Sequence, residues 1–174
     1  MRALFALPNL LSLARLPLAL AFLLTDQRAV RLALIAAAGA TDFLDGWLAR
    51  RGRGSRLGAI LDPVTDKTFW IVAMISLAVQ GPLSTGELLV MLSRDIAVAI
   101  GVAIILLRGA TMEFRARMPG KVATVVQLAG LVALVAFPAL KRPVIILVGA
   151  VSAIAILDYA RVGVRALRAS QTAH

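Results

Sequence analysis

Residues 41–67 have the sequence TDFLDGWLARRGRGSRLGAILDPVTDK, and this stretch determines how the rest of the chain is interpreted. It joins two segments that are apolar enough to lie in a bilayer, through a short basic loop. It also places four aspartates in or beside those segments: Asp42, Asp45, Asp62 and Asp66. A carboxylate in a membrane segment is energetically costly, so its presence there indicates a functional site.

The composition predicts an integral membrane protein. Of the 174 residues 60% are hydrophobic, and the mean hydropathy is +0.90, whereas soluble domains are about 45–50% apolar. The length suits a single domain covering residues 1–174. The chain has no cysteine, which excludes disulfides and thiolate chemistry.

The net charge of +10 favours anionic membrane lipids and phosphate-bearing substrates as partners. Nucleic acid is the other class of partner that a basic chain can bind, but here the basic residues lie at the ends of apolar segments. We therefore expect no nucleic-acid partner.

The hydropathy pattern predicts an all-α fold with six transmembrane helices, because a helix needs about 20 mostly apolar residues to cross the hydrocarbon. The loops between them are Pro- and Gly-containing or basic. The residues before Pro8 are also consistent with a short interfacial helix. The six predicted segments are 8–25, 29–50, 57–80, 86–108, 120–140 and 143–167.

The distribution of basic residues predicts that both termini are cytoplasmic. With the termini on one side, that side carries twelve Lys and Arg residues in its short loops and the other side four. We therefore expect a protein of a bacterial-type inner or plasma membrane, with the aspartates in a polar cavity open to the cytosol.

The spacing of the aspartates predicts one acidic cluster. Asp42 and Asp45 are three residues apart and Asp62 and Asp66 are four apart, so each pair lies on one helical face. The short loop makes the two helices antiparallel neighbours whose faces can converge. Four close carboxylates repel one another unless a cation lies between them. Oxygen donors suit Mg²⁺, Mn²⁺ or Ca²⁺, with room for two ions.

Small residues around the aspartates allow a phosphate or nucleotide to approach the backbone. They are Gly46, Ala49 and Gly58, and Arg50 one turn beyond Gly46 can offer a planar fork to a diphosphate. The alternative is that the carboxylates only form interfacial salt bridges. Their partners would then be Arg50, Arg53, Arg56 or Lys67.

The pattern Asp42-x-x-Asp45-Gly46-x-x-Ala49-Arg50, followed after seven residues by Gly58-x-x-x-Asp62-x-x-x-Asp66, resembles the signature of the CDP-alcohol phosphotransferase family. The spacer is at the short end of the family's range. Further stretches resemble the phospholipid-synthesising branch. These are Pro8-Asn9-Leu10-Leu11 with Arg15, Leu61-Asp62-Pro63, Asp66-Lys67, Ser93-Arg94-Asp95, and Gly120-Lys121-Val122 with Gln127.

The resemblance implies a six-helix enzyme, usually a homodimer, that uses CDP-diacylglycerol and two Mg²⁺ or Mn²⁺ ions. Asp66 would complete the metal site and act as general base on the acceptor hydroxyl, with release of CMP. The implied metal ligands are Asp42, Asp45, Asp62 and Asp66, and the implied cytidine diphosphate site is Gly46, Ala49, Arg50 and Gly58.

The remaining basic residues have two interpretations each. Arg94 either pairs with Asp95 or contacts an acceptor phosphate or lipid phosphate; adjacent helical residues do not face each other, which favours the second. The basic residues of the loop 108–119, together with the lysine just after it, form a cytoplasmic cluster that is either simply solvated or holds an anionic acceptor. The candidates there are Arg108, Arg115, Arg117 and Lys121.

The leading functional hypothesis is transfer of a phosphatidyl group to a glycerol-type acceptor. The resemblance favours phosphatidylglycerol, as in cardiolipin synthases, over glycerol 3-phosphate, as in phosphatidylglycerophosphate synthases, or inositol phosphate. A cation transporter is the alternative from another class, because intramembrane carboxylates also mark ion pathways. Charge confined to one end of the segments favours a one-sided cavity and hence the enzyme.

Overall fold

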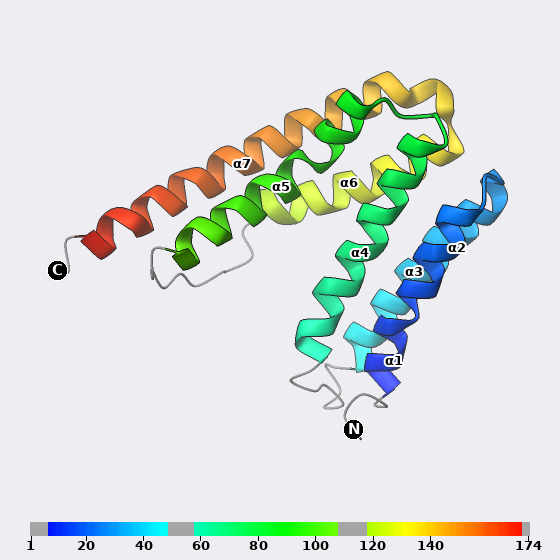
Figure 1. Ribbon diagram of the computed structural model, residues 1–174, viewed down its shortest axis with the longest axis horizontal. Coiled ribbons are helices and arrows are strands. Elements are labelled where there is room, and N and C mark those ends of the chain that lie inside the picture. The colour runs from blue at the N-terminus through cyan, green and yellow to red at the C-terminus, as the bar shows by residue number, and fades with distance from the viewer. Residues whose placement is uncertain (1–6, 49–57, 108–117, 172–174) are drawn as a thin grey trace. The chain divides into compact units, whose positions relative to one another are not determined.

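The computed structural model describes residues 7–48, 58–107 and 118–171, and it describes side chains for residues 9–48, 63–105, 107 and 118–164 (Figure 1). These residues form helices and no strands. The helices are α1 (Leu7–Leu13), α2 (Arg15–Leu24), α3 (Arg28–Leu48), α4 (Gly58–Val79), α5 (Thr85–Leu107), α6 (Met118–Ala136), the 3₁₀ turn η2 (Pro138–Leu140) and α7 (Lys141–Gln171).

The predicted all-helical fold is confirmed, and helix covers most of the described part of each predicted segment; the segment 120–140 runs past the end of α6 at Ala136 into η2. The first segment differs in being divided at Ala14 into α1 and α2. Pro17 explains the division, because it has no N–H to donate to the carbonyl four residues before it. The chain turns between α4 and α5 at Gly81, whose φ of 102° favours glycine.

The N-terminal unit, Met1–Ser84, contains α1 to α4. The helices α1 and α2 pack against both α3 and α4, while α3 and α4 contact each other only slightly. The two signature helices run antiparallel, as predicted (Figure 1). They are nevertheless joined mainly through the first segment rather than directly, so α1 and α2 contribute side chains to the region between them.

A buried arginine holds together the end of this unit that contains the α2–α3 turn. Arg31 is 6% exposed, and its Nε donates to the carbonyl of Thr25 at 2.9 Å. Its Nη2 donates to Ser76 Oγ on α4 at 3.3 Å and to Gln80 Oε1, one residue after the end of α4. The guanidinium also lies over the Phe22 ring, 5.1 Å from the centroid. Asp45 lies fourteen residues further along α3, so this arginine is remote from the signature aspartates.

The C-terminal unit, Thr85–His174, contains α5 to α7. The long helix α7 packs against both α5 and α6. Glycines permit the close approach: a Cβ on Gly149 would lie 3.0 Å from Val90 Cγ1 of α5, and one on Gly130 would lie 2.9 Å from Val148 Cγ2 of α7. Lys141 Nζ and Glu87 Oε2 form an ion pair at 2.9 Å between the first turns of α7 and α5.

Among the described residues, three stretches are long and apolar enough to span a membrane: Thr85–Ile105, Met118–Ala136 and Pro138–Val164. The protein is therefore an integral membrane protein, as predicted. The helices α3 and α4 have comparable lengths, 21 and 22 residues, but carry the signature charges. The count of six spans, the orientation and the division into a single domain remain predictions.

Candidate active site

Two signature aspartates of α3 converge on one arginine. Arg15 Nη2 lies 3.1 Å from Asp42 Oδ1 and also forms an ion pair with Asp45 Oδ2. Ser12 Oγ donates to the same Asp45 oxygen at 3.2 Å. The Nε of Arg15 donates to Thr41 Oγ1 at 3.4 Å, so the guanidinium contacts α3 on two sides. The first segment therefore supplies the positive charge that two neighbouring carboxylates require.

The two carboxylates differ in exposure. The side chain of Asp45 is 3% exposed and that of Arg15 is 1% exposed, whereas the side chain of Asp42 is 60% exposed. Burying a carboxylate costs roughly several kcal/mol of folding free energy unless the group is paired and hydrogen-bonded, and Asp45 is both. Asp45 is thus fixed in the interior, while Asp42 combines the same counter-ion with access from outside.

This arrangement fits a hard divalent cation in charge and in donor type. One oxygen of each carboxylate contacts the same cationic nitrogen, so the two aspartates already share one positively charged partner. Carboxylate oxygens are the donors that Mg²⁺ and Mn²⁺ prefer. Within the part of the chain that the structure describes, no three acidic or histidine side chains gather into a metal-binding group. The side chain of Asp62 lies outside that part, so the convergence of all four aspartates remains a prediction.

The other predicted site residues are placed as follows. Asp66 lies on α4 and is exposed, and it has polar interactions within the structure. Gly46 lies on α3, one residue after Asp45, and Gly58 is the first residue of α4. Lys121 lies in the first turn of α6 and is exposed. Outside the described residues are Ala49, Arg50, Arg108, Arg115 and Arg117.

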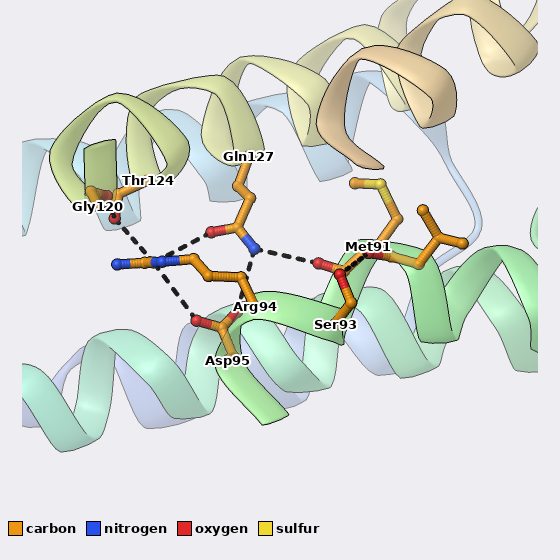
Figure 2. A network of polar contacts seen from close by, with 8 residues as sticks. Met91, Ser93, Arg94, Asp95, Gly120, Thr124 and Gln127 are labelled. Atoms are coloured by element: carbon orange, nitrogen blue, oxygen red, sulfur yellow. Dashed lines mark hydrogen bonds and ion pairs between the residues drawn. The ribbon is translucent and has the colours of Figure 1, made fainter. Parts of the chain in front are cut away.

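Arg94 lies in a polar network between α5 and α6 (Figure 2). Its Nη1 donates to Thr124 Oγ1 at 3.1 Å and to Gln127 Oε1 at 3.4 Å, and lies 3.5 Å from Asp95 Oδ1. The Nε of Arg94 is buried and has no hydrogen-bond partner. Arg94 does pair with Asp95, so the interpretation that each of these neighbours finds its partner elsewhere was incomplete. The side chains of consecutive helical residues can still meet around a shared third group, here Gln127.

Gln127 holds this network together. It is 3% exposed, and its Nε2 donates to the Met91 carbonyl at 3.1 Å and to Asp95 Oδ2 at 3.2 Å. Figure 2 shows the amide of Gln127 extending from α6 toward α5, with the guanidinium of Arg94 beside it. One side of Arg94 is therefore anchored by Nη1, while its buried Nε makes no hydrogen bond.

Sequence reasoning identified the aspartates but missed their counter-ion. Asn9, Ser12 and Arg15 recur every three residues in an otherwise apolar stretch, and all three are at most 1% exposed. Spacing of this kind places polar groups on one helical face and could have indicated that the first segment takes part in the site. The salt-bridge partners considered from sequence were Arg50, Arg53, Arg56 and Lys67 instead.

Residues 5–157 match the sequence model of the CDP-alcohol phosphatidyltransferase family, a range that contains the paired aspartates, Arg15 and the Arg94 network. The chain belongs to this family. The family is generally dependent on divalent metals, which agrees with the charge and donor type of the site.

Several relatives have names that specify a reaction. A CDP-diacylglycerol–glycerol-3-phosphate 3-phosphatidyltransferase of Aquifex aeolicus is 38% identical over 112 residues, covering 61% of this chain and 63% of the relative. A cardiolipin synthase (CMP-forming) of Rattus norvegicus is 37% identical over 97 residues, covering 53% and 32%. A probable phosphatidylglycerophosphate synthase of Mycobacterium tuberculosis is 35% identical over 131 residues, covering 70% and 61%. The chain thus spans less than two thirds of the length of each.

Proposed function

We propose that this protein is a phosphatidyltransferase that moves the phosphatidyl group of CDP-diacylglycerol to a hydroxyl of a glycerol-type acceptor and releases CMP. The observation that carries the proposal is the pairing of the signature residues Asp42 and Asp45 around a buried cationic group. Family membership indicates which reaction this acidic site catalyses. Relatives named as a glycerol-3-phosphate 3-phosphatidyltransferase and as a cardiolipin synthase support a glycerol-type acceptor.

Each proposed residue has a distinct role. Asp66 takes the proton of the acceptor hydroxyl as its oxygen forms a bond to the lipid-bearing phosphorus. The bond from that phosphorus to the bridging oxygen of the diphosphate breaks, and CMP leaves with the electron pair. Gly46, Ala49, Arg50 and Gly58 accommodate the cytidine diphosphate.

The proposed metal ligands are Asp42, Asp45, Asp62 and Asp66, which would hold two Mg²⁺ or Mn²⁺ ions. When bound, such ions neutralise the charge of the diphosphate and stabilise the leaving oxygen. The carboxylate chemistry of the described ligands fits this role, and Asp42 is exposed enough to meet a soluble ion.

Arg94 is the proposed contact for the phosphate of the acceptor or the lipid. Its Nη1 is anchored to α6 and to Asp95, while its buried Nε lacks an acceptor. Because an arginine can bind a phosphate through two parallel N–H groups, a guanidinium held at one nitrogen is pre-organised for such a contact. Lys121 and the loop residues Arg108, Arg115 and Arg117 are proposed to attract the same anion.

We favour phosphatidylglycerol as the acceptor, which makes the product cardiolipin. Glycerol 3-phosphate is the second candidate, supported by the Aquifex aeolicus and Mycobacterium tuberculosis relatives; inositol phosphate is the third. The proposal also includes a homodimer with a cytosol-facing site in a bacterial-type inner or plasma membrane.

The test is CMP release by the purified protein in detergent, with CDP-diacylglycerol and Mg²⁺ or Mn²⁺. Phosphatidylglycerol, glycerol 3-phosphate and inositol phosphate are supplied separately, each with and without a chelator. Release with a single acceptor that stops with the chelator is expected, and the lipid product identifies the acceptor. If a protein that thermal melting shows to be folded releases no CMP with any of these acceptors, the proposal is contradicted and the cation transporter is favoured.

A further inference from the structure

We infer that Arg15 is a positioning residue that serves as the internal counter-ion of Asp42 and Asp45 and competes with the divalent cation for them. The inference rests on the proposed metal-dependent transfer, and it adds a determinant of metal affinity from outside the signature. Arg15 lies on the first segment, 27 positions before Asp42. Its role is therefore invisible in the motif itself.

The geometry shows what Arg15 does for the metal-free protein. One nitrogen, Nη2, contacts an oxygen of each carboxylate. Two aspartates three residues apart on a helix repel each other, and the repulsion is largest where water is excluded. Asp45 and Arg15 are both almost fully buried, so solvent screens their attraction less than it screens the attraction between Arg15 and the exposed Asp42. Arg15 therefore stabilises the paired carboxylates before any ion arrives.

The same contacts set the affinity for a cation. A divalent ion that binds Asp42 and Asp45 comes close to the guanidinium, whether or not Arg15 keeps its hydrogen bonds. Like charges at such short range oppose each other. Arg15 must consequently weaken metal binding while it stabilises the metal-free fold, and both effects must disappear together when its charge is removed.

The test compares three variants by thermal melting and by Mn²⁺ binding measured with electron paramagnetic resonance. Arg15→Gln removes the charge and Arg15→Lys retains it. Arg31→Gln is the matched control, because Arg31 is also a buried, multiply hydrogen-bonded arginine of the same unit but contacts no signature aspartate. Every variant is measured with a chelator and with saturating Mn²⁺, without substrate.

Arg15→Gln is expected to lower the melting midpoint in chelator by roughly 5 °C or more, because a buried carboxylate loses its counter-ion. Saturating Mn²⁺ should recover at least about half of that loss, since binding to the native state stabilises it. Its Mn²⁺ dissociation constant should be at least about threefold lower than in the wild type. Arg15→Lys should restore both quantities toward wild type.

Arg31→Gln should lower the midpoint by the same amount with and without Mn²⁺ and leave the dissociation constant unchanged. The inference is overturned if Arg15→Gln binds Mn²⁺ with unchanged or weaker affinity, or if Mn²⁺ recovers none of the stability lost by this variant. It is also overturned if neither the wild type nor Arg15→Gln binds Mn²⁺. These measurements do not use CMP release, so the role of Arg15 can fail while the proposed transfer stands, and the transfer can fail while Arg15 still controls Mn²⁺ affinity.

Discussion

The phenol of Tyr159 on α7 lies directly against the backbone of Gly120 on α6. A Cβ on Gly120 would overlap the phenol oxygen and lie 3.0 Å from Cζ of the ring. Gly120 is also the residue whose carbonyl accepts a hydrogen bond from Thr124 Oγ1 at 3.1 Å. The contact thus fixes the first turn of α6, next to Lys121 and to the network that anchors Arg94.

Replacing Gly120 with alanine is expected to destabilise the protein. The added methyl group must displace the rigid Tyr159 ring, and overpacking of this kind costs about 1–3 kcal/mol. The measurement is the melting midpoint in detergent. Gly101→Ala is the matched control, because nothing lies within 4 Å of a Cβ at that position of α5. There the substitution should stabilise by roughly 0.5–1 kcal/mol through helix propensity. Equal effects at the two glycines would show that the Tyr159 contact is unimportant.

Replacing Asp66 with asparagine tests the proposed general base. The variant keeps the size of the side chain but cannot take the acceptor's proton, so the rate of CMP release should fall by about 10²–10⁴-fold at saturating metal. Asp26→Asn is the control, because Asp26 is an exposed aspartate in the α2–α3 turn, at the other end of the same unit. If the rate of CMP release by Asp66→Asn stays within about threefold of the wild-type rate, Asp66 is not the general base.

Replacing Gln127 with leucine tests the support of Arg94. Leucine has a similar volume but removes the hydrogen bonds that Gln127 makes with Arg94, Asp95 and the Met91 carbonyl, which should destabilise the protein by about 1–3 kcal/mol. If Arg94 binds the acceptor, its loss of anchoring should raise the KM for the acceptor more than it lowers kcat.

Thr124→Val is the graded comparison for this network. It removes one hydrogen bond to Arg94 Nη1 and the hydrogen bond that Thr124 Oγ1 donates to the Gly120 carbonyl. Because Gln127 keeps its three contacts in this variant, the effects on stability and on acceptor KM should be smaller than those of Gln127→Leu. An acceptor KM unchanged in both variants, despite a lowered melting midpoint, would assign the network a purely structural role.

The fold was largely predictable because each helix is an apolar run interrupted by turn residues, and local composition alone decides such segments. The division of the first run at Ala14 was not predicted, although Pro17 gives its physical reason. The arrangement of helices depends on packing, which hydropathy does not contain. For that reason the slight contact between α3 and α4 was missed.

The candidate site was predictable in part. Carboxylates spaced three or four apart in an apolar segment are a local pattern, so Asp42 and Asp45 could be found. Their partner Arg15 is 30 positions from Asp45, and only tertiary packing of α1 and α2 on α3 brings it there. The Arg94–Gln127 contact likewise joins residues of two helices. Sequence spacing gives no measure of such pairings.

Replacing Arg31 with glutamine should destabilise the N-terminal unit without changing catalysis. The guanidinium satisfies the Thr25 carbonyl, Ser76 and Gln80 in a buried position, and hydrogen bonds to charged groups contribute about 1.5–3 kcal/mol each at most. We expect a loss of roughly 2–4 kcal/mol in the free energy of unfolding. Arg28→Gln is the control, because Arg28 is exposed at the start of the same helix.

The kinetic constants of Arg31→Gln should match those of the wild type below its melting transition. Arg31 and Asp45 are separated by about 21 Å along α3, from a rise of about 1.5 Å per residue, and the contacts of Arg31 all lie at the α2–α3 turn and the end of α4. The measurement is kcat and KM for CMP release at a temperature where both proteins are folded. A selective fall in kcat would mean that α3 transmits displacement from the turn to the aspartates, and the two ends of the helix would then have to be treated as one coupled element.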